Sequence, residues 1–201
     1  FSFGHKFQKY ELPVLVSDNE TLQVYAKKGT VKSPTITTNF YKIDPNIKIE
    51  LKTKYANQYN AGGDNALIDG IVGAEDFRTG TWQGYNDIDL IAVVDVGKVK
   101  EVSKASVGFL EDQRSWIFLP TKVEIYVSSD NKKFTKVKSE KVNSATPREH
   151  VSIKNMEFNL ENKKARYIKV VAKKLGTLPE WHLGFKHDGR SWLFVDEIQI
   201  K

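Results

Sequence analysis

The chain has 201 residues, 40% of them hydrophobic, which is enough for one large β domain or for one domain with a small appendage. It has no cysteine, which excludes disulfides, thiolate metal sites and a cysteine nucleophile. No apolar run approaches the roughly 18 residues that a transmembrane helix needs. The net charge is +6, but the lysines are spread over strands and turns, so we expect no nucleic-acid partner.

The first 45 residues predict a small β appendage. Short strands are expected at 12–16, 22–26 and 36–41, and Asp44-Pro45-Asn46 is typical of a hinge. Three short strands seldom form a stable core, and we therefore expect this segment to pack against the main domain. Because the sequence starts at Phe1 and not at Met, we expect a fragment or a processed form.

Residues 46–201 predict a β-sandwich or jelly roll. Apolar and polar residues alternate with period two, and no segment offers a convincing helix of three turns. The expected strands lie at residues 47–52, 90–96, 122–127, 134–137, 156–160, 166–172 and 193–200.

The connection at residues 59–85 is long and rich in glycine, and its apolar residues argue against disorder, so we expect an ordered site. Its carboxylates are oxygen ligands of the kind that calcium prefers, and its glycines let carbonyls turn inward. Asp69 before Gly70 fits a calcium ligand and a turn cap equally well. Asp196 and Glu197 in the last expected strand offer a second acidic pair.

The large aromatic residues lie in or beside predicted loops. If their rings are exposed, they could stack on sugars or form a protein interface. If the rings are buried, they would belong to the core. The histidines show no metal-ligand spacing, and no nucleophile elbow, phosphate loop or zinc motif is present, so we expect no enzyme activity of its own.

Four segments carry a resemblance to a known family. NALIDG at 65–70, GTW at 80–82, SWIFLP at 115–120 and VDEI at 195–198 resemble discoidin domains, also called coagulation factor 5/8 type C domains. That family includes the family 32 carbohydrate-binding modules. The variant here is similar to modules at the C-terminal end of bacterial family 20 glycoside hydrolases, the β-hexosaminidases, through AGGD at 61–64, WQGY at 82–85 and PEWH at 179–182. Residues 1–45 resemble a fibronectin type III-associated or chitobiase C-terminal segment.

The resemblance implies an all-β, galactose-binding-like, eight-stranded jelly-roll β-sandwich at 46–201 with a structural calcium. Sugar would bind at the loop-bearing end of the sandwich. The implied metal ligands are Ala66, Asp69, Thr79 or Thr81, and Glu197. The implied sugar-binding residues are Arg78, Trp82, Tyr85, Glu111, Arg114, Trp116, Trp181 and His182.

The function implied is that of a non-catalytic carbohydrate-binding module from a larger glycoside hydrolase, exported to the periplasm or cell surface of a bacterium. Its partners would be a glycan and the catalytic domain of the same polypeptide. One alternative is a structural accessory domain that packs against the catalytic domain without binding sugar. Another is a lipid or protein adhesion module. Phe118 and Leu119 could form its apolar spike, but Pro120 and the adjoining strand favour a place in the core for them.

Overall fold

The computed structural model describes residues 1–3, 6–16, 18, 20–40 and 42–201. The chain divides into two compact units, Phe1–Asp44 and Pro45–Lys201. None of the helices in the described ranges is long and apolar enough to span a membrane.

Unit 1 is built on a small antiparallel sheet with the order β1-β2-β5 and a separate hairpin of β3 and β4. The prediction of a strand at 12–16 is wrong: Pro13 has no amide hydrogen to donate, and Leu12 and Leu15 are exposed. Tyr41, the expected end of another strand, lies outside the described residues. The strands are β1 (Ser2–Phe3), β2 (Glu20–Val24), β3 (Lys27–Lys28), β4 (Val31–Lys32) and β5 (Ile36–Phe40).

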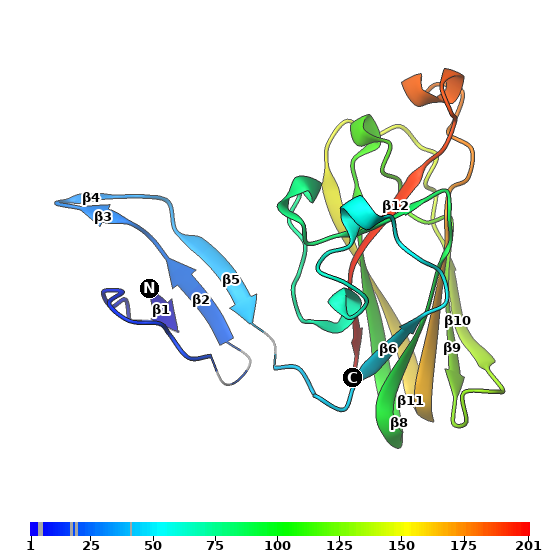
Figure 1. The fold of residues 1–201 in the computed structure, drawn as a ribbon, viewed down its shortest axis with the longest axis horizontal. Coiled ribbons are helices and arrows are strands. Elements are labelled where there is room, and N and C mark those ends of the chain that lie inside the picture. The colour runs from blue at the N-terminus through cyan, green and yellow to red at the C-terminus, as the bar shows by residue number, and fades with distance from the viewer. Residues whose placement is uncertain (4–5, 17, 19, 41) are drawn as a thin grey trace. The chain divides into compact units, whose positions relative to one another are not determined.

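Unit 2 is an antiparallel jelly-roll β-sandwich, which confirms the predicted fold class (Figure 1). Its strands pair in the order β10-β9-β11-β8-β12-β7, and β6 pairs with β8. They are β6 (Lys48–Leu51), β7 (Gln83–Asn86), β8 (Leu90–Glu111), β9 (Lys122–Ser128), β10 (Thr135–Lys141), β11 (Ser152–Lys173) and β12 (Trp192–Ile200).

The two longest strands, β8 and β11, each take part in both faces of the sandwich. The first part of β8 pairs with β6 and with the second part of β11, as in Val94 opposite Ile168. The last part of β8 pairs with β12 and with the first part of β11, as in Phe109 opposite Val195. Register shifts in β11 and Gly97 (φ 84°) in β8 accompany the change of face. The strands predicted at 156–160 and 166–172 are therefore one continuous strand.

The main hydrophobic core draws on both parts of β8, with Val94 and Phe109 fully buried in one cluster. A smaller cluster consists of Trp82, Leu110, Ile117 and Phe194. Alternation along each strand sends one set of side chains inward, which is why the period-two pattern located most of the strands.

The connection at residues 59–85 is ordered and attached to the sandwich. It contains the short 3₁₀ helices η2 (Ala66–Ile68) and η3 (Phe77–Thr79), and η1 (Asn57–Tyr59) leads into it. The Trp82 indole Nε1 donates to the carbonyl of Ala74 (2.8 Å), and the Gln83 side chain donates to the carbonyl of Gly63 (2.7 Å). Gly73 lies so close to the Trp82 ring that any Cβ there would clash.

Candidate functional site

A hollow of about 310 Å³ lies at the loop-bearing end of unit 2. It is formed by loops that are far apart in the sequence, around η4 (Gln113–Ser115), around residues 147–149 and ahead of η5 (Leu183–Lys186). In Figure 1, η4 (green) and η5 (orange) appear at the same end of the unit. The lining residues are Gln113, Arg114, Trp116, Pro147, Arg148, Glu149, Trp181, His182 and Leu183. Four of the predicted sugar-binding residues thus meet here: Arg114, Trp116, Trp181 and His182.

Trp181 presents an aromatic surface to solvent, with 45% of the residue exposed. Its indole Nε1 donates to the carbonyl of Ala145 (3.1 Å), and its ring contacts Phe118 and His182. These contacts hold the ring in one orientation. A fixed, half-exposed indole beside hydrogen-bonding groups can take the apolar C–H face of a sugar ring.

Trp116 forms another part of the wall. Its backbone lies in the left-handed region (φ 65°), and its ring stacks on His187 at a centroid distance of 6.1 Å. A left-handed backbone is uncommon for a bulky residue, and such outliers concentrate at functional sites.

His182 is hydrogen-bonded to backbone groups through both ring nitrogens. Its Nε2 lies 2.7 Å from the carbonyl oxygen of Gln113, and its Nδ1 accepts from the amide of Gly184 (3.0 Å). These partners assign the neutral tautomer with the proton on Nε2. Both ring nitrogens are occupied and the residue is buried, so the prediction that His182 hydrogen-bonds a sugar is corrected.

Gln113, which was not among the predicted site residues, links the loops that form the hollow. Its Nε2 donates to Glu111 Oε1 and to the carbonyl of Thr146, both at 2.9 Å. Its Oε1 accepts from the amide of Arg148 (2.8 Å), and its carbonyl accepts from His182. Nothing in the sequence marks this glutamine, because its partners lie up to 69 residues away.

Glu111 lies beneath the hollow and does not line it, since only 1% of the residue is exposed. Burial raises the pKa of its carboxyl group. The hydrogen bond from Gln113 and the charge of the nearby Arg148 partly offset this rise. Arg148 Nε lies 3.0 Å from Glu111 Oε2, an ion pair without hydrogen-bond geometry. The predicted direct contact of Glu111 with a ligand is therefore corrected.

The exposed hydrogen-bonding groups of the hollow include two guanidinium groups. The side chain of Arg148 is 48% exposed and that of Arg114 is 74% exposed. Arg114 Nε lies 3.7 Å from Asp112 Oδ1, so its donors remain available to a ligand. Two guanidinium groups beside an indole can hydrogen-bond sugar hydroxyls while a ring stacks on the indole.

Besides Glu111, three further predicted sugar-binding residues do not reach this hollow. Trp82 and Tyr85 are core residues, 1% and 0% exposed, and burial raises the pKa of Tyr85. They are buried because the 59–85 connection folds back onto β12, which puts these rings inside. Arg78 forms a two-pronged ion pair with Asp76 (2.7 and 3.0 Å) and does not line the hollow.

A separate cluster of carboxylates joins the 59–85 connection to β12. The amide of Gly70 donates to Glu197 Oε2 (3.2 Å), and the amide of Gly73 donates to Asp196 Oδ2 (2.8 Å). Burial raises the pKa of Glu197 to about 8, and the charges of Asp69 and Asp196 add to this effect. No lysine or arginine within the described ranges forms an ion pair with these carboxylates.

The donor set around η2 fits a calcium ion in part. The buried carboxylate of Glu197 lies near Asp69 and near a turn with backbone carbonyls. A cation that prefers oxygen ligands would stabilise such a carboxylate. Across the described residues, however, no group of three or more His, Asp or Glu side chains could hold a metal ion. Carbonyls such as that of Ala66 would have to complete the shell. Thr79 Oγ1 lies 3.2 Å from Thr81 Oγ1 and bonds to the carbonyl of Asp76 (2.9 Å), so its contacts are local.

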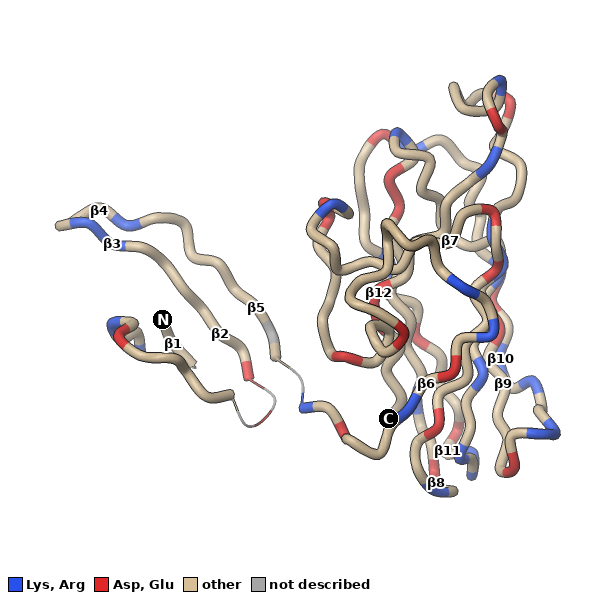
Figure 2. The backbone as a smooth tube through the Cα atoms, viewed as in Figure 1, with Lys and Arg blue, Asp and Glu red and all other residues tan. Residues whose placement is uncertain are grey.

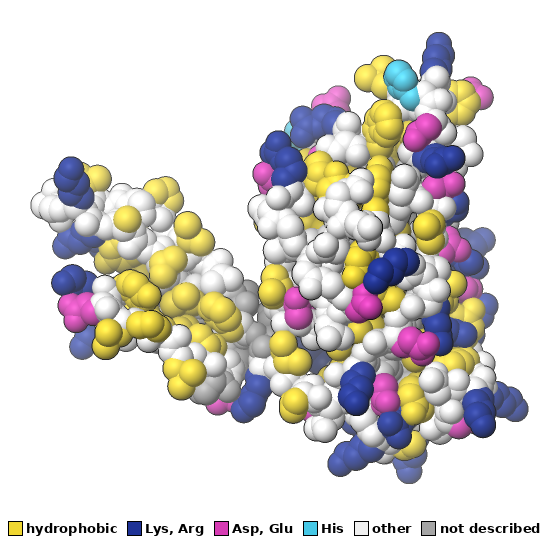
Figure 3. Space-filling view, viewed as in Figure 1, with side chains coloured by type: hydrophobic (Ala, Val, Ile, Leu, Met, Phe, Trp, Pro, Cys, Tyr) yellow, Lys and Arg dark blue, Asp and Glu magenta, His cyan; other side chains and the backbone are white. Residues whose placement is uncertain are grey.

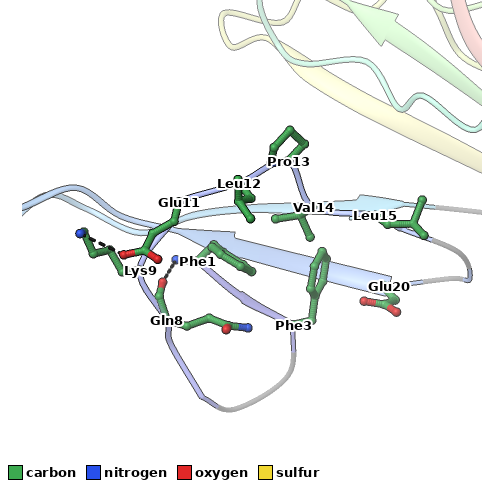
Figure 4. Close-up of a pocket in the computed structure, with 10 residues that line it drawn as sticks. All are labelled: Phe1, Phe3, Gln8, Lys9, Glu11, Leu12, Pro13, Val14, Leu15 and Glu20. Atoms are coloured by element: carbon green, nitrogen blue, oxygen red, sulfur yellow. Dashed lines mark hydrogen bonds and ion pairs between the residues drawn. The ribbon is translucent and has the colours of Figure 1, made fainter.

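Unit 1 has an open groove of its own, of about 540 Å³ (Figure 4). Phe1, Phe3, Leu12 and Val14 line it with other residues, and an ion pair of Lys9 with Glu11 lies at its edge. Its lining offers few polar groups that converge on one point, so the hollow of unit 2 is the better candidate site.

The F5/8 type C domain model matches residues 50–197. No curated protein matches the sequence. Among solved structures, CpGH89CBM32-5 from Clostridium perfringens, in complex with GalNAc-β-1,3-galactose, is 19% identical and has a TM-score of 0.44, with 77% of this chain and 94% of that chain covered. Chitosan-binding module 1 from a Paenibacillus sp. IK-5 chitosanase/glucanase is 14% identical with a TM-score of 0.48, covering 78% and 95%.

Proposed function

The chain belongs to the F5/8 type C domain family, and on this premise we propose that unit 2 is a non-catalytic carbohydrate-binding module. The observation that carries the proposal is the half-exposed, fixed Trp181 ring beside the donors of Arg114 and Arg148 in one hollow. A sugar ring would stack on Trp181 while the guanidinium groups hydrogen-bond its hydroxyls. Weak affinity at a single site is sufficient when the module is tethered to an enzyme, because tethering raises the effective concentration.

The test is a glycan array followed by calorimetric titration of the sugars that bind. Trp181→Ala removes the stacking surface, worth about 1–1.5 kcal/mol, and is expected to weaken binding about tenfold with little change in melting temperature. Tyr10→Ala, which removes an exposed ring outside the hollow, is the control and should leave affinity unchanged. Absence of sugar binding with and without calcium, or equal effects of the two variants, would refute the proposal.

We also propose a structural calcium ion at η2, held by Asp69, Glu197 and carbonyls including that of Ala66, with Thr79 or Thr81 as a further ligand. Its support is the link between Gly70 and Glu197, which brings the two acidic segments together. Chelation is expected to lower the melting temperature, because an ion that binds only the folded state stabilises it by mass action. Asp69→Ala should abolish that dependence, whereas Asp64→Ala, which changes an exposed acid, should retain it. If chelation has no effect, Asp69 is a turn cap for Ile71.

The parent protein is proposed to be an exported bacterial glycoside hydrolase of the β-hexosaminidase type. The support is the likeness of PEWH at 179–182 and WQGY at 82–85 to modules of such enzymes. The catalytic domain of the same polypeptide would then be a second partner. The flanking sequence of the gene tests this proposal, and a neighbouring domain of unrelated chemistry would contradict it.

A second candidate function is packing against that catalytic domain. The rim of the hollow carries exposed apolar side chains, with Leu183 88% and Phe185 37% exposed next to Trp181. Hydrogen exchange on the full-length enzyme distinguishes the two: protection of η5 without sugar favours packing. The alternative of a lipid spike is not supported: Phe118 and Leu119 are 1% and 2% exposed and belong to the core, the placement that the sequence favoured.

A further inference from the structure

The end of unit 2 that lies away from the hollow is formed by the bends of the two long strands and by one turn. These segments are residues 97–104 of β8, residues 160–166 of β11 and residues 129–134 between β9 and β10. Pairing places Lys164 opposite Glu101 and Ala165 opposite Lys100. The β9–β10 turn lies beside them, because Tyr167 pairs with Ser128 just ahead of the turn. The sandwich thus brings three distant sequence segments together.

Lysines dominate this end. Figure 2 shows blue segments at the lower ends of β8 and β11 and at the β9–β10 turn, and Figure 3 shows dark blue side chains over the same end. Five of the lysines are exposed and Lys100 is half-buried. We call these residues the lysine end: Lys98, Lys100, Lys132, Lys133, Lys163 and Lys164.

The six lysines of the lysine end outnumber the three acids of the same segments, which are Glu101, Asp130 and Glu161. None of these six lysines forms one of the ion pairs found within the described part of the chain. The neighbouring acids are engaged elsewhere: Glu161 pairs with Lys138 (2.6 Å), and Asp130 Oδ1 accepts from two backbone amides of its own turn. Glu101 is the exposed acid that remains.

The chemistry of this end favours a ligand that offers repeated negative charge and little else. Phe134 is the aromatic residue of these turns, and the Lys169 ammonium group covers its ring at 4.3 Å, so no exposed ring offers a stacking platform for nucleic-acid bases. Val99 is the one large apolar side chain of these segments that is half exposed, which is too little for insertion into a lipid bilayer. Lysine ammonium groups bind phosphate, sulfate or carboxylate as point charges, without a shaped pocket.

We propose that the lysine end is a second binding surface, for a linear anionic polymer that carries phosphate, sulfate or carboxylate groups. The lysine end and Trp181 lie at opposite ends of the strands. Binding of a polymer there would therefore not depend on the proposed sugar site. A module with one contact at each end could hold its parent protein on a charged surface while the hollow engages a sugar.

The test uses the whole chain with heparin and with polyphosphate as probes, at several salt concentrations. The variant Lys100→Gln/Lys163→Gln/Lys164→Gln is compared with the control Lys27→Gln/Lys28→Gln/Lys32→Gln, which removes the same charge from the β3–β4 hairpin of unit 1. We expect about tenfold weaker binding and a shallower salt dependence for the first variant, and little change for the control. Melting temperatures of all three proteins establish that each is folded.

Equal losses in the two triple variants would show that net charge drives binding and would overturn the proposal. Binding to vesicles that contain an anionic lipid, without binding to either polymer, would also overturn it, in favour of a membrane surface. Trp181→Ala should leave polymer binding intact. Loss of polymer binding in this variant would place the polymer in the hollow and contradict a second surface. The lysine variant should keep any sugar affinity of the parent chain.

Discussion

Gln113 is expected to be the residue whose loss most damages the hollow. Its side chain makes three hydrogen bonds in a buried position, to Glu111, to the Thr146 carbonyl and to the Arg148 amide. Each contributes about 1 kcal/mol net, and Gln113→Ala also leaves the buried partner groups unpaired. We therefore expect a loss of about 3–5 kcal/mol in the free energy of unfolding, within the roughly 5–15 kcal/mol of a typical domain.

Equilibrium unfolding in urea measures this loss, with Gln58→Ala as an exposed control that should stay within about 0.5 kcal/mol of the parent. Sugar affinity should fall as well, because Gln113 holds the segment that carries Arg148. A loss below about 1 kcal/mol for Gln113→Ala would refute the bridging role.

The near-isosteric Gln113→Glu provides a sharper comparison. It keeps the acceptor for the Arg148 amide but loses both donated hydrogen bonds and places a second carboxyl group beside Glu111. The folded-state pKa of the new carboxyl should lie above its unfolded value. The stability it contributes when protonated is then present at low pH and lost as pH rises. The variant should therefore be more destabilised at pH 7 than at pH 4, and an equal deficit at both would contradict the contact.

Two further predictions concern the scaffold. Lys122 and Lys136 hold the pKa of Glu124 at about 2, below its ordinary 4.5, so this stabilisation is present above pH 4.5 and lost as pH falls toward 2. Because both lysines are partly exposed, we expect about 1–2 kcal/mol, seen as a steeper fall in melting temperature with acid for the parent than for Glu124→Gln. Gly73→Ala would place a Cβ 2.2 Å from the Trp82 ring and should cost about 2–3 kcal/mol in urea unfolding, and a loss under about 0.5 kcal/mol would contradict the close packing.

The alternation of apolar residues predicted the all-β fold and most of its strands, because burial of one face leaves a period-two signal in the sequence. The same signal could not show that β8 and β11 run through both faces. At a bend such as Gly97 the alternation is interrupted, and an interrupted pattern looks the same as two strands joined by a loop.

The residue types that a sugar site needs could be read from the sequence alone, which placed Trp116 and Trp181 in or beside loops. Which rings face solvent depends on the three-dimensional packing: Trp82 is buried against Phe194, while Trp181 is half exposed. The same packing places Gln113 and Arg148, 35 residues apart, in one wall of the hollow. Exposure and long-range hydrogen bonds depend on which segments the sheet brings together, and a local pattern carries no record of them.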